Sequence, residues 1–261
     1  MDFFDILGGH FAVFLLLLTR VSGIFIVSPF FGTMNIPIMF RAVASFTIAV
    51  VLFPVVDKLG AVENVPTVLL FGAAVLSELL VGWLIGLVGY IVFAAINMGG
   101  KVMDMQVGFA IVNVMDPTTG QQSPLIGSFL FNLGTIVLLV TNGHHVILYA
   151  LAESFNLIPL AMAAPSSSLA MLIGNFTVGI FATGMKLAMP VTFAILMTNV
   201  GLGILARTMP QMNIFVVGIP MQLMIGIGSL SMILPFYIIF LDSMFQTMYR
   251  NISMMMKLLI P

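Results

Sequence analysis

Hydrophobic residues run along this chain in long, nearly uninterrupted stretches whose ends are marked by charged residues. Stretches without any Asp, Glu, Lys or Arg cover 21–40, 42–56, 79–100, 117–152, 154–185, 187–206 and 208–241. Strands of a membrane barrel would alternate apolar and polar residues, so continuous runs favour helices. The pattern predicts six helices, at 10–28, 38–56, 67–98, 125–150, 169–200 and 212–241.

Two of these predicted helices, 67–98 and 169–200, are longer than a membrane crossing requires. A helix rises ~1.5 Å per residue, so about 20 residues cross a hydrocarbon core of ~30 Å. We therefore expect them to be tilted, broken or different from simple spans. Prolines also interrupt or flank the apolar runs and predict kinked or discontinuous helices, which is typical of a pore or transporter; they are Pro29, Pro37, Pro54, Pro190, Pro210, Pro220 and Pro235.

The composition points to the same class of protein. Hydrophobic residues make up 61% of the 261 residues and charged residues only 7%, against about 25% charged in a soluble domain. The mean hydropathy is +1.22, which indicates an integral membrane protein. A net charge of -1 gives no basic footprint for nucleic acid. Without cysteine, disulfides, thiolate nucleophiles and sulfur-ligated metals are excluded.

The two ends of the chain predict its orientation in the membrane. Asp2 and Asp5 make the N-terminus acidic where a signal peptide would be basic, so the first apolar segment is expected to be retained. Arg250 and Lys257 follow the last apolar run and predict a cytoplasmic C-terminus. An acidic end outside and a basic end inside require an odd number of crossings. One of the six segments is therefore expected to be re-entrant, split or outside the bilayer plane.

No enzyme is predicted from the residues. Gly179–Lys186 lacks the lysine and the hydroxyl residue at the positions that a phosphate-binding loop requires. The adjacent His144 and His145 make a poor metal pair, because neighbours on a helix or turn do not face one another. No Ser-His-acid grouping is present at a recognisable spacing. We therefore predict neither a cofactor nor a catalytic or metal site.

Two charged residues lie inside apolar segments, where each costs ~2.5–3.5 kcal/mol at a helix centre. They are Glu78 and Lys186. Either they serve as a proton or ion relay, or they form structural ion pairs or face an aqueous lumen; the structural interpretation is favoured, because a relay needs more than two scattered groups. Gly82 and Gly86 form a small-xxx-small pair that predicts close helix packing, either within the chain or, slightly favoured, against another subunit.

Short motifs spread over residues 19–220 give the chain a resemblance to a known family. It resembles the FliR family of flagellar export-gate proteins, and the matching stretches are Thr19–Gly23, Ser28–Gly32, Ile36–Pro37, Arg41, Gly108–Ala110, Asp116–Pro117, Gln122–Pro124, Asn142–His144, Ser154–Pro159, Asn199–Gly203, Ala206–Arg207, Pro210–Phe215 and Gly218–Pro220. The Pro-Gln-Met-Asn-Ile-Phe stretch at 210–215 is particularly specific.

The resemblance implies a subunit of the type III secretion export gate at the base of the bacterial flagellum. In that family one FliR joins several copies of FliP and FliQ, with FlhB and FlhA associated. The implied fold is all-α, built of helical hairpins with kinked and broken helices. It looks like a fusion of a FliP-like part, about 1–200, and a FliQ-like part, about 201–261. Much of the assembly would stand above the plane of the inner membrane at the basal body.

The resemblance also assigns a role to the most polar segment of the chain. A loop at this position in the family projects into the lumen and helps to close the channel, which maps onto about 106–122 here. The plug and gate residues are then Met105, Gln106, Val107, Gly108, Phe109, Asn113, Met115, Asp116, Pro117, Gly120, Gln121 and Gln122. Gly108 and Gly120 permit tight turns, and Met98, Met103, Met105 and Met115 could form a compliant seal around a moving chain.

Charged residues near this loop and in the later helices complete the candidate site. We expect the following to be buried or to face the lumen: Glu78, Lys101, Asp104, Lys186 and Arg207. Lys101 stands where many family members carry an uncharged or acidic residue. An i,i+3 ion pair between Lys101 and Asp104 is the simplest explanation for both charges.

These observations lead to one preferred function and two alternatives. The preferred function is an export-gate subunit that passes unfolded flagellar proteins across the inner membrane, with lipid, FliP and FliQ as neighbours. The first alternative is a proton-coupled small-solute permease that uses Glu78, Asp104 and Lys186. The second is the related virulence secretion apparatus, which only overall likeness separates from the flagellar one.

Overall fold

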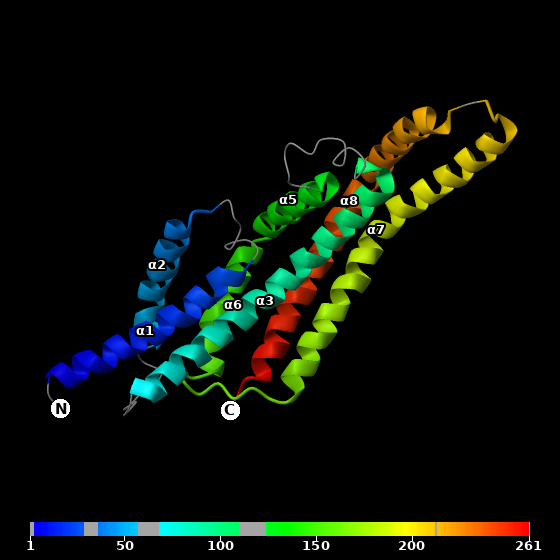
Figure 1. Ribbon diagram of the computed structural model, residues 1–261. Helices are drawn as coiled ribbons and strands as arrows, with labels where there is room; N and C mark the ends of the chain where they lie inside the picture. The colour runs from blue at the N-terminus through cyan, green and yellow to red at the C-terminus, as the bar shows by residue number, and fades with distance from the viewer. Residues whose placement is uncertain (1–2, 29–35, 57–67, 110–123, 212, 261) are drawn as a thin grey trace. The chain divides into compact units, whose positions relative to one another are not determined.

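A computed structural model describes residues 3–28, 36–56, 68–109, 124–211 and 213–260. All regular elements within these ranges are α-helices (Figure 1), which confirms the predicted all-α class. They are α1 (Phe3–Val27), α2 (Ile38–Val56), α3 (Val68–Val107), α5 (Leu125–Val140), α6 (Gly143–Leu157), α7 (Ser168–Thr208) and α8 (Ile214–Lys257).

Most of these helices are long and apolar enough to cross a membrane. Five meet this criterion in the described part of the chain, or six when α5 and α6 are counted together as one broken span. The most apolar window of α3 is 61% buried within the chain, whereas those of α2 and α8 are only 11% buried. Most side chains in those two windows are therefore left for lipid or for neighbouring proteins.

The two overlong segments are continuous helices. The chain passes without a break through α3, which has 40 residues, and α7, which has 41. At ~1.5 Å per residue each is about 60 Å long, twice the ~30 Å of a hydrocarbon core. The expectation that they are broken was wrong, and the expectation that they are not simple spans is supported.

The prolines are accommodated without ending the helices that contain them. Pro54 lies inside α2, Pro190 inside α7, and Pro220 and Pro235 inside α8. Near Pro190 the protein supplies an extra partner to the backbone, because the Tyr237 hydroxyl donates a 2.9 Å hydrogen bond to the carbonyl of Leu187. The predicted discontinuities at these prolines are therefore absent.

The predicted helix 125–150 is split into two helices, which is one of the three forms expected for one of the six predicted segments. Helix α5 ends at Val140 and α6 begins at Gly143. Between them, Asn142 has φ 58, in the left-handed region that asparagine enters more readily than most residues. The Asn-Gly pair at 142–143 thus separates two helices within one apolar run.

The last helix continues well beyond its predicted end at residue 241. Polar residues enter the sequence there, yet α8 runs to Lys257 because one of its faces stays apolar. The buried residues of this extension recur at helical spacing and are Met244, Phe245, Met248, Ile252, Met255 and Met256. The sequence prediction ended with the uninterrupted apolar run and missed this amphipathic part.

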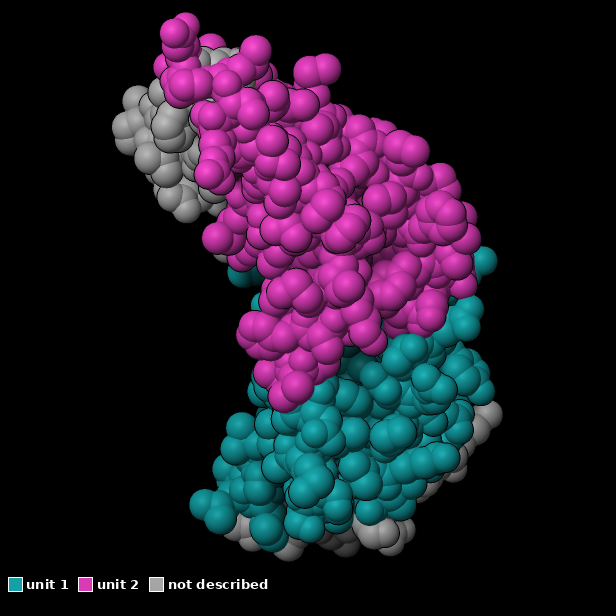
Figure 2. Space-filling model, turned by 90° about the vertical axis from the view of Figure 1, so that its right-hand side faces the viewer, with its two compact units in different colours: residues 1–91, 142–176, 245–261 teal, residues 92–141, 177–244 magenta. Residues whose placement is uncertain are grey.

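The chain divides into two compact units, shown in different colours in Figure 2. Unit 1 comprises 1–91, 142–176 and 245–261, and unit 2 comprises 92–141 and 177–244. Each unit therefore draws on separate parts of the sequence, and α3, α7 and α8 each contribute to both. The predicted FliP-like and FliQ-like division near residue 200 concerns a likeness to other proteins and stays a prediction.

In unit 1, α1 packs against both α2 and α3. Edge-to-face rings join α1 to α2, with Phe14 5.6 Å from Phe46 and 5.9 Å from Phe53 between centroids. On the other side, a Cβ at Gly82 of α3 would overlap the carbonyl of Arg20, and one at Gly86 would lie 3.2 Å from that of Ile24. The small residues of α3 thus serve packing within the chain, and the preference for another subunit was wrong for this pair.

In unit 2, α3 forms continuous seams with α5 and α7. Phe93 meets Phe131 edge to face at 5.1 Å, and a Cβ at Gly100 would overlap the backbone of Gly127. Against α7, a Cβ at Gly99 would lie 2.7 Å from the carbonyl of Gly184. Glycines that interrupt the hydrophobic pattern near the predicted end of this helix at 98 are therefore contact points, and α3 continues past them to Val107.

Candidate functional site

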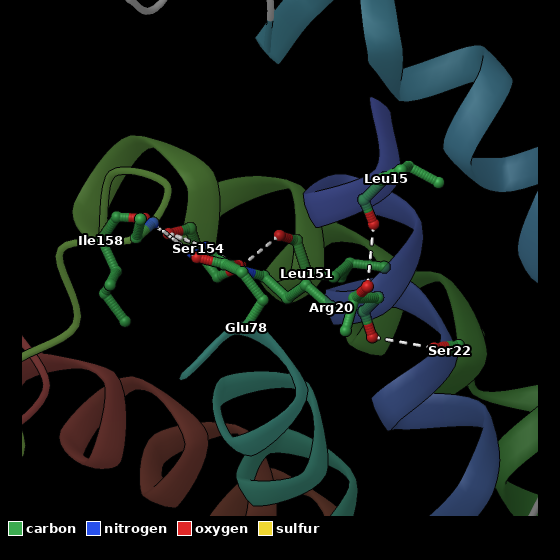
Figure 3. A network of polar contacts seen from close by, with 9 residues as sticks. Leu15, Arg20, Ser22, Glu78, Leu151, Ser154 and Ile158 are labelled. Carbon is green, nitrogen blue, oxygen red and sulfur yellow. Dashed lines mark hydrogen bonds and ion pairs between the residues drawn. The ribbon is translucent and has the colours of Figure 1, made fainter. Parts of the chain in front are cut away.

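Unit 1 contains a charged pair that is fully enclosed by protein (Figure 3). Arg20 of α1 and Glu78 of α3 both have 0% exposed surface. Arg20 Nε lies 2.5 Å from Glu78 Oε2, and Arg20 Nη2 lies 3.1 Å from Oε1. This two-point geometry is the one in which the planar guanidinium and carboxylate fit best.

The remaining donors of Arg20 hold the C-terminal end of α6. Nη1 donates to the carbonyl and hydroxyl oxygens of Ser154 at 3.0 and 3.3 Å, and Nη2 to the carbonyl of Ile158 at 3.0 Å. With Glu78, these make five acceptors for the five N–H groups of a guanidinium. The guanidinium also lies 4.5 Å from the ring centre of Phe155. The cation is thus placed where the helix dipole of α6 is negative.

The carboxylate of Glu78 has a third partner in the turn after α6. Its Oε1 accepts a 2.8 Å hydrogen bond from the N–H of Ala161, a residue with the uncommon φ of 62. The pair therefore joins α1, α3 and the chain that leaves α6. A buried ion pair contributes stability only when its hydrogen bonds are satisfied, and this one meets the condition.

Unit 2 contains a second buried charge, Asp104, near the end of α3. Its side chain is 5% exposed. Oδ1 accepts a 2.9 Å hydrogen bond from the N–H of Ile126, and Oδ2 a 3.1 Å bond from the N–H of Gly127. These are the second and third residues of α5, so the carboxylate caps the first turn of a different helix and lies at the positive end of its dipole.

The sequence at the start of α5 explains why a cap from another helix is used. The residue before this helix is Pro124, which provides no side-chain hydrogen bond to the first turn. Serine, threonine, asparagine or aspartate would normally supply that bond. Gly127 leaves room for α3 to approach, because its neighbour across the seam is Gly100. Asp104 can then reach N–H groups that would otherwise be unsatisfied.

The last turn of α3 is held by α8 as well. A Cβ at Gly226 of α8 would lie 2.6 Å from the methyl groups of Val107, whose side chain is fully buried. Gly108, which follows the helix, has φ 95, a conformation that favours glycine. Nearby on α8, Gln222 donates a hydrogen bond to the Asn199 side chain of α7. The described contacts thus fix where α3 ends.

Of the predicted plug residues, five are described and occupy this turn. Met105 and Gln106 are exposed, Val107 and Gly108 are buried, and Phe109 is half-buried. Helix α3 continues to Val107, so the start of the loop lies two residues later than predicted. Outside the described residues lie Asn113, Met115, Asp116, Pro117, Gly120, Gln121 and Gln122. The predicted tight turn at Gly108 is confirmed by its φ.

The predicted set of buried or lumen-facing charges divides into two groups. Glu78 and Asp104 are buried, whereas Lys101, Lys186 and Arg207 have exposed side chains. The bonds of the Asp104 carboxylate go to α5, so the proposed ion pair with Lys101 was the wrong explanation for this charge. Glu78 takes part in a buried ion pair, as the structural interpretation expects, since its carboxylate is bonded to Arg20 and to the N–H of Ala161.

The roles of two residues, Arg20 and Met103, were missed or misassigned from the sequence. Arg20 was noticed only as part of the family motif, although a lone cation between apolar residues 11–18 and 21–27 is a signal for a buried partner. Met103 was expected in a compliant seal around a moving chain. Its side chain is fully buried, with its sulfur 3.8 Å from the Tyr237 hydroxyl, so it belongs to the core of unit 2.

These features define a multi-pass membrane protein of long helices whose internal charges are used to fasten helix ends. The model of the family described as "Bacterial export proteins, family 1" matches residues 11–248. The match covers far more than half of the chain, and the chain therefore belongs to this family.

Relatives that match two thirds or more of the chain carry the same name. The chain is 36% identical over 219 residues to the flagellar biosynthetic protein FliR of Bacillus subtilis, covering 83% of each chain. It is 30% identical over 231 residues to FliR of Aquifex aeolicus, covering 88% of each, and 35% identical over 175 residues to FliR of Pectobacterium carotovorum, covering 67% of each. The resemblance that the sequence motifs indicated is confirmed, and membership of an export family makes the chain a transport component rather than an enzyme.

Proposed function

We propose that this chain is a core subunit of the flagellar type III protein export gate. With FliP and FliQ it forms the channel through which unfolded flagellar proteins cross the inner membrane, and FlhB and FlhA associate with it at the basal body. The observation that carries the proposal is the family match over residues 11–248, together with near-full-length relatives named flagellar biosynthetic protein FliR.

The distribution of apolar surface supports a role inside an assembly. Helices α7 and α8 expose large apolar side chains along much of their length, among them Phe181, Phe193, Val216, Met224 and Phe236. Lipid covers part of such a surface in a membrane protein. Long helices of about 60 Å exceed a bilayer, however, so apolar surface beyond the ~30 Å core requires protein neighbours. FliP and FliQ subunits would supply them.

Residues 106–122 act as the plug of the closed channel in this proposal. The described contacts that support this role hold the helices at the two ends of the segment. Val107 is packed on α8 at one end, and the first turn of α5 is capped by Asp104 at the other. A segment anchored at both ends can be displaced by cargo and return to the same place.

Co-purification tests the assignment to the export gate, and ion permeability tests the plug role of residues 106–122. The chain, isolated from native membranes, is expected to bring FliP and FliQ with it in a fixed ratio; recovery as a lone monomer would overturn the gate assignment. Deleting residues 110–120 is expected to leave the assembly intact and to make cells leak ions. Unchanged ion permeability in an assembled deletion variant would remove the plug role alone.

The rival function is a proton-coupled permease that relays protons through Glu78, Asp104 and Lys186. The local geometry argues for structural roles of the two carboxylates, because Glu78 binds Arg20 and the Ala161 N–H, while Asp104 binds two N–H groups of α5. A permease should also transport when purified alone. Neutralising Glu78 and Lys186 together is a second test, since motility retained in that variant excludes a relay through them.

The flagellar system is preferred to the virulence secretion apparatus by the names of the relatives. Those described above are all called flagellar biosynthetic protein FliR. Complementation decides between the two: the chain is expected to restore motility to a flagellated cell that lacks its own FliR. Restoration of virulence-type secretion without motility would favour the other apparatus.

A further inference from the structure

Two helix ends in unit 2 are joined by a single buried carboxylate. Asp104 belongs to the last turn of α3, and both of its oxygens accept hydrogen bonds from the first turn of α5, at 2.9 and 3.1 Å. The same two helices are in contact at Gly100 and Gly127. Hydrogen bonds to an ionised acceptor are stronger than neutral ones, so this contact resists separation of the two helix ends.

We propose that Asp104 is a positioning residue of the export gate, which clamps the end of α3 to the start of α5 so that the two ends keep a fixed spacing during export. The consequence for channel closure rests on the proposed function. The clamp itself rests only on the described contacts, so the clamp and the proposed function can fail separately.

A simple requirement for helix capping does not explain this arrangement. Serine or aspartate in place of Pro124 would satisfy the first turn of α5 from within its own segment. The chain instead has a proline there and satisfies the same N–H groups with a charge buried on another helix. Burying a carboxylate is unfavourable without such partners. The cross-helix bond therefore has a use that a local cap would lack, which is to tie α5 to α3.

The contacts around Asp104 show what the clamp holds. Further along the seam, α3 and α5 meet at Phe93 and Phe131 and at Ile96 and Gly134. These apolar contacts fix the middle of the pair and leave the ends to be fixed separately. On its other side, the last turn of α3 packs on α8 through Val107 and Gly226. The bonds to Asp104 therefore fix the start of α5 relative to the end of α3, which is itself held by α8.

Distance measurement on the purified complex tests the clamp directly. The chain has no cysteine, so spin labels can be attached at two introduced cysteines, Met105→Cys on α3 and Phe129→Cys on α5, whose parent side chains are both exposed in the chain. The parent is expected to give a narrow distance distribution. Asp104→Asn should broaden it about twofold, because the charge-assisted bonds between the ends are lost. An unchanged width would overturn the clamp.

A second-site variant separates clamping from capping. Pro124→Asp in the Asp104→Asn background restores a local cap to α5 without restoring the tie to α3. The proposal expects the distribution to stay broad. Recovery of the narrow distribution would show that capping alone is required and would overturn the clamp.

A different variant is used if Asp104→Asn does not assemble. Ile126→Pro removes one of the two N–H donors in the first turn of α5 and keeps the charge of Asp104. An unchanged width of the distance distribution in this variant also overturns the clamp.

Ion permeability distinguishes this inference from the proposed function. Asp104→Asn is expected to raise the leak of assembled gates several-fold, and to add little in a chain that also lacks 110–120. A deletion variant that leaks while assembled Asp104→Asn stays tight would overturn the positioning role. A deletion variant that stays tight would overturn the plug, and the distance measurement would still decide the clamp.

Discussion

Arg20 and Glu78 are 58 residues apart in sequence and form an ion pair from which solvent is completely excluded. The pair uses all the donors of the guanidinium and binds the backbone at Ser154, Ile158 and Ala161. Its position indicates that it holds α1, α3 and the end of α6 together. Two changes of sequence test whether the pair stabilises the protein in this way.

The first prediction concerns removal of one partner of this pair. Glu78→Ala leaves the Arg20 cation buried without its counter-ion and the Ala161 N–H without its acceptor, so a loss of about 3–5 kcal/mol of stability is expected. Replacing both residues by methionine should cost less than Glu78→Ala alone, since no unpaired charge remains. The measurement is the unfolding temperature of the purified complex.

The matched control for that experiment is Arg207→Ala, which removes an exposed charge. It should change the unfolding temperature very little, because exposed charges contribute ~0–1 kcal/mol. A double variant less stable than Glu78→Ala would contradict the account, as it would show that neither charge is costly when left alone.

The second prediction concerns the close approach of α1 and α3. A Cβ at Gly82 would overlap the Arg20 carbonyl, which belongs to backbone and has little freedom to move. Gly82→Ala should therefore push the two helices apart and cost about 1–3 kcal/mol. Gly72→Ala, in the same helix, meets nothing within 4 Å and should be neutral or stabilising by about 0.4–1 kcal/mol. Equal effects of the two substitutions on the unfolding temperature would refute the packing argument.

The third prediction concerns the break between α5 and α6. Asn142 has φ 58, which a β-branched residue adopts at a cost of about 1–2 kcal/mol. Asn142→Val should lower the yield of assembled protein, whereas Asn142→Gly should be tolerated. Thr141→Val is the control, because Thr141 has the ordinary φ of -81. If Asn142→Val accumulates as well as Thr141→Val, the left-handed turn is not required.

The sequence was sufficient for the class of fold and for the existence of most helices. Long apolar runs with few charges located α1, α2, α3, α5, α7 and most of α8, because in a membrane protein burial of charge is the dominant constraint. The boundaries were less predictable. The predicted helix ended at residue 98, just before Gly99 and Gly100, yet these glycines are where α7 and α5 approach α3. Only the partner surface distinguishes a glycine that ends a helix from one that permits contact.

The candidate site was predicted in part for a related reason. Glu78 was recognised as a costly charge, but its partner Arg20 lies on another helix, and sequence alone does not pair residues 58 positions apart. Asp104 was assigned to Lys101, its neighbour by helical spacing. The structure gives it to N–H groups of Ile126 and Gly127, backbone donors that leave no trace in a pattern of side chains. The motifs of the family located the loop between these residues and said nothing of how its ends are held.

The last prediction tests whether the end of α3 must be packed on α8. Gly226→Ala places a methyl group where Val107 now lies, 2.6 Å from its γ-carbons, and should cost about 1–3 kcal/mol by overpacking. Gly228→Ala, two residues further along α8, meets open space and should have little effect. Since Val107 lies one residue before the turn at Gly108, the displaced valine should also raise the ion leak of assembled gates.

A compensating change makes this prediction specific to the contact. Val107→Ala alone removes buried apolar surface at a cost of about 2 kcal/mol. Combined with Gly226→Ala it restores room for the new methyl group, so the double variant should be more stable than the sum of the single effects by about 1 kcal/mol. Both the unfolding temperature and the ion leak should recover together. Strict additivity would mean that the two residues do not compete for the same space, and recovery of stability without recovery of the leak would separate packing from channel closure.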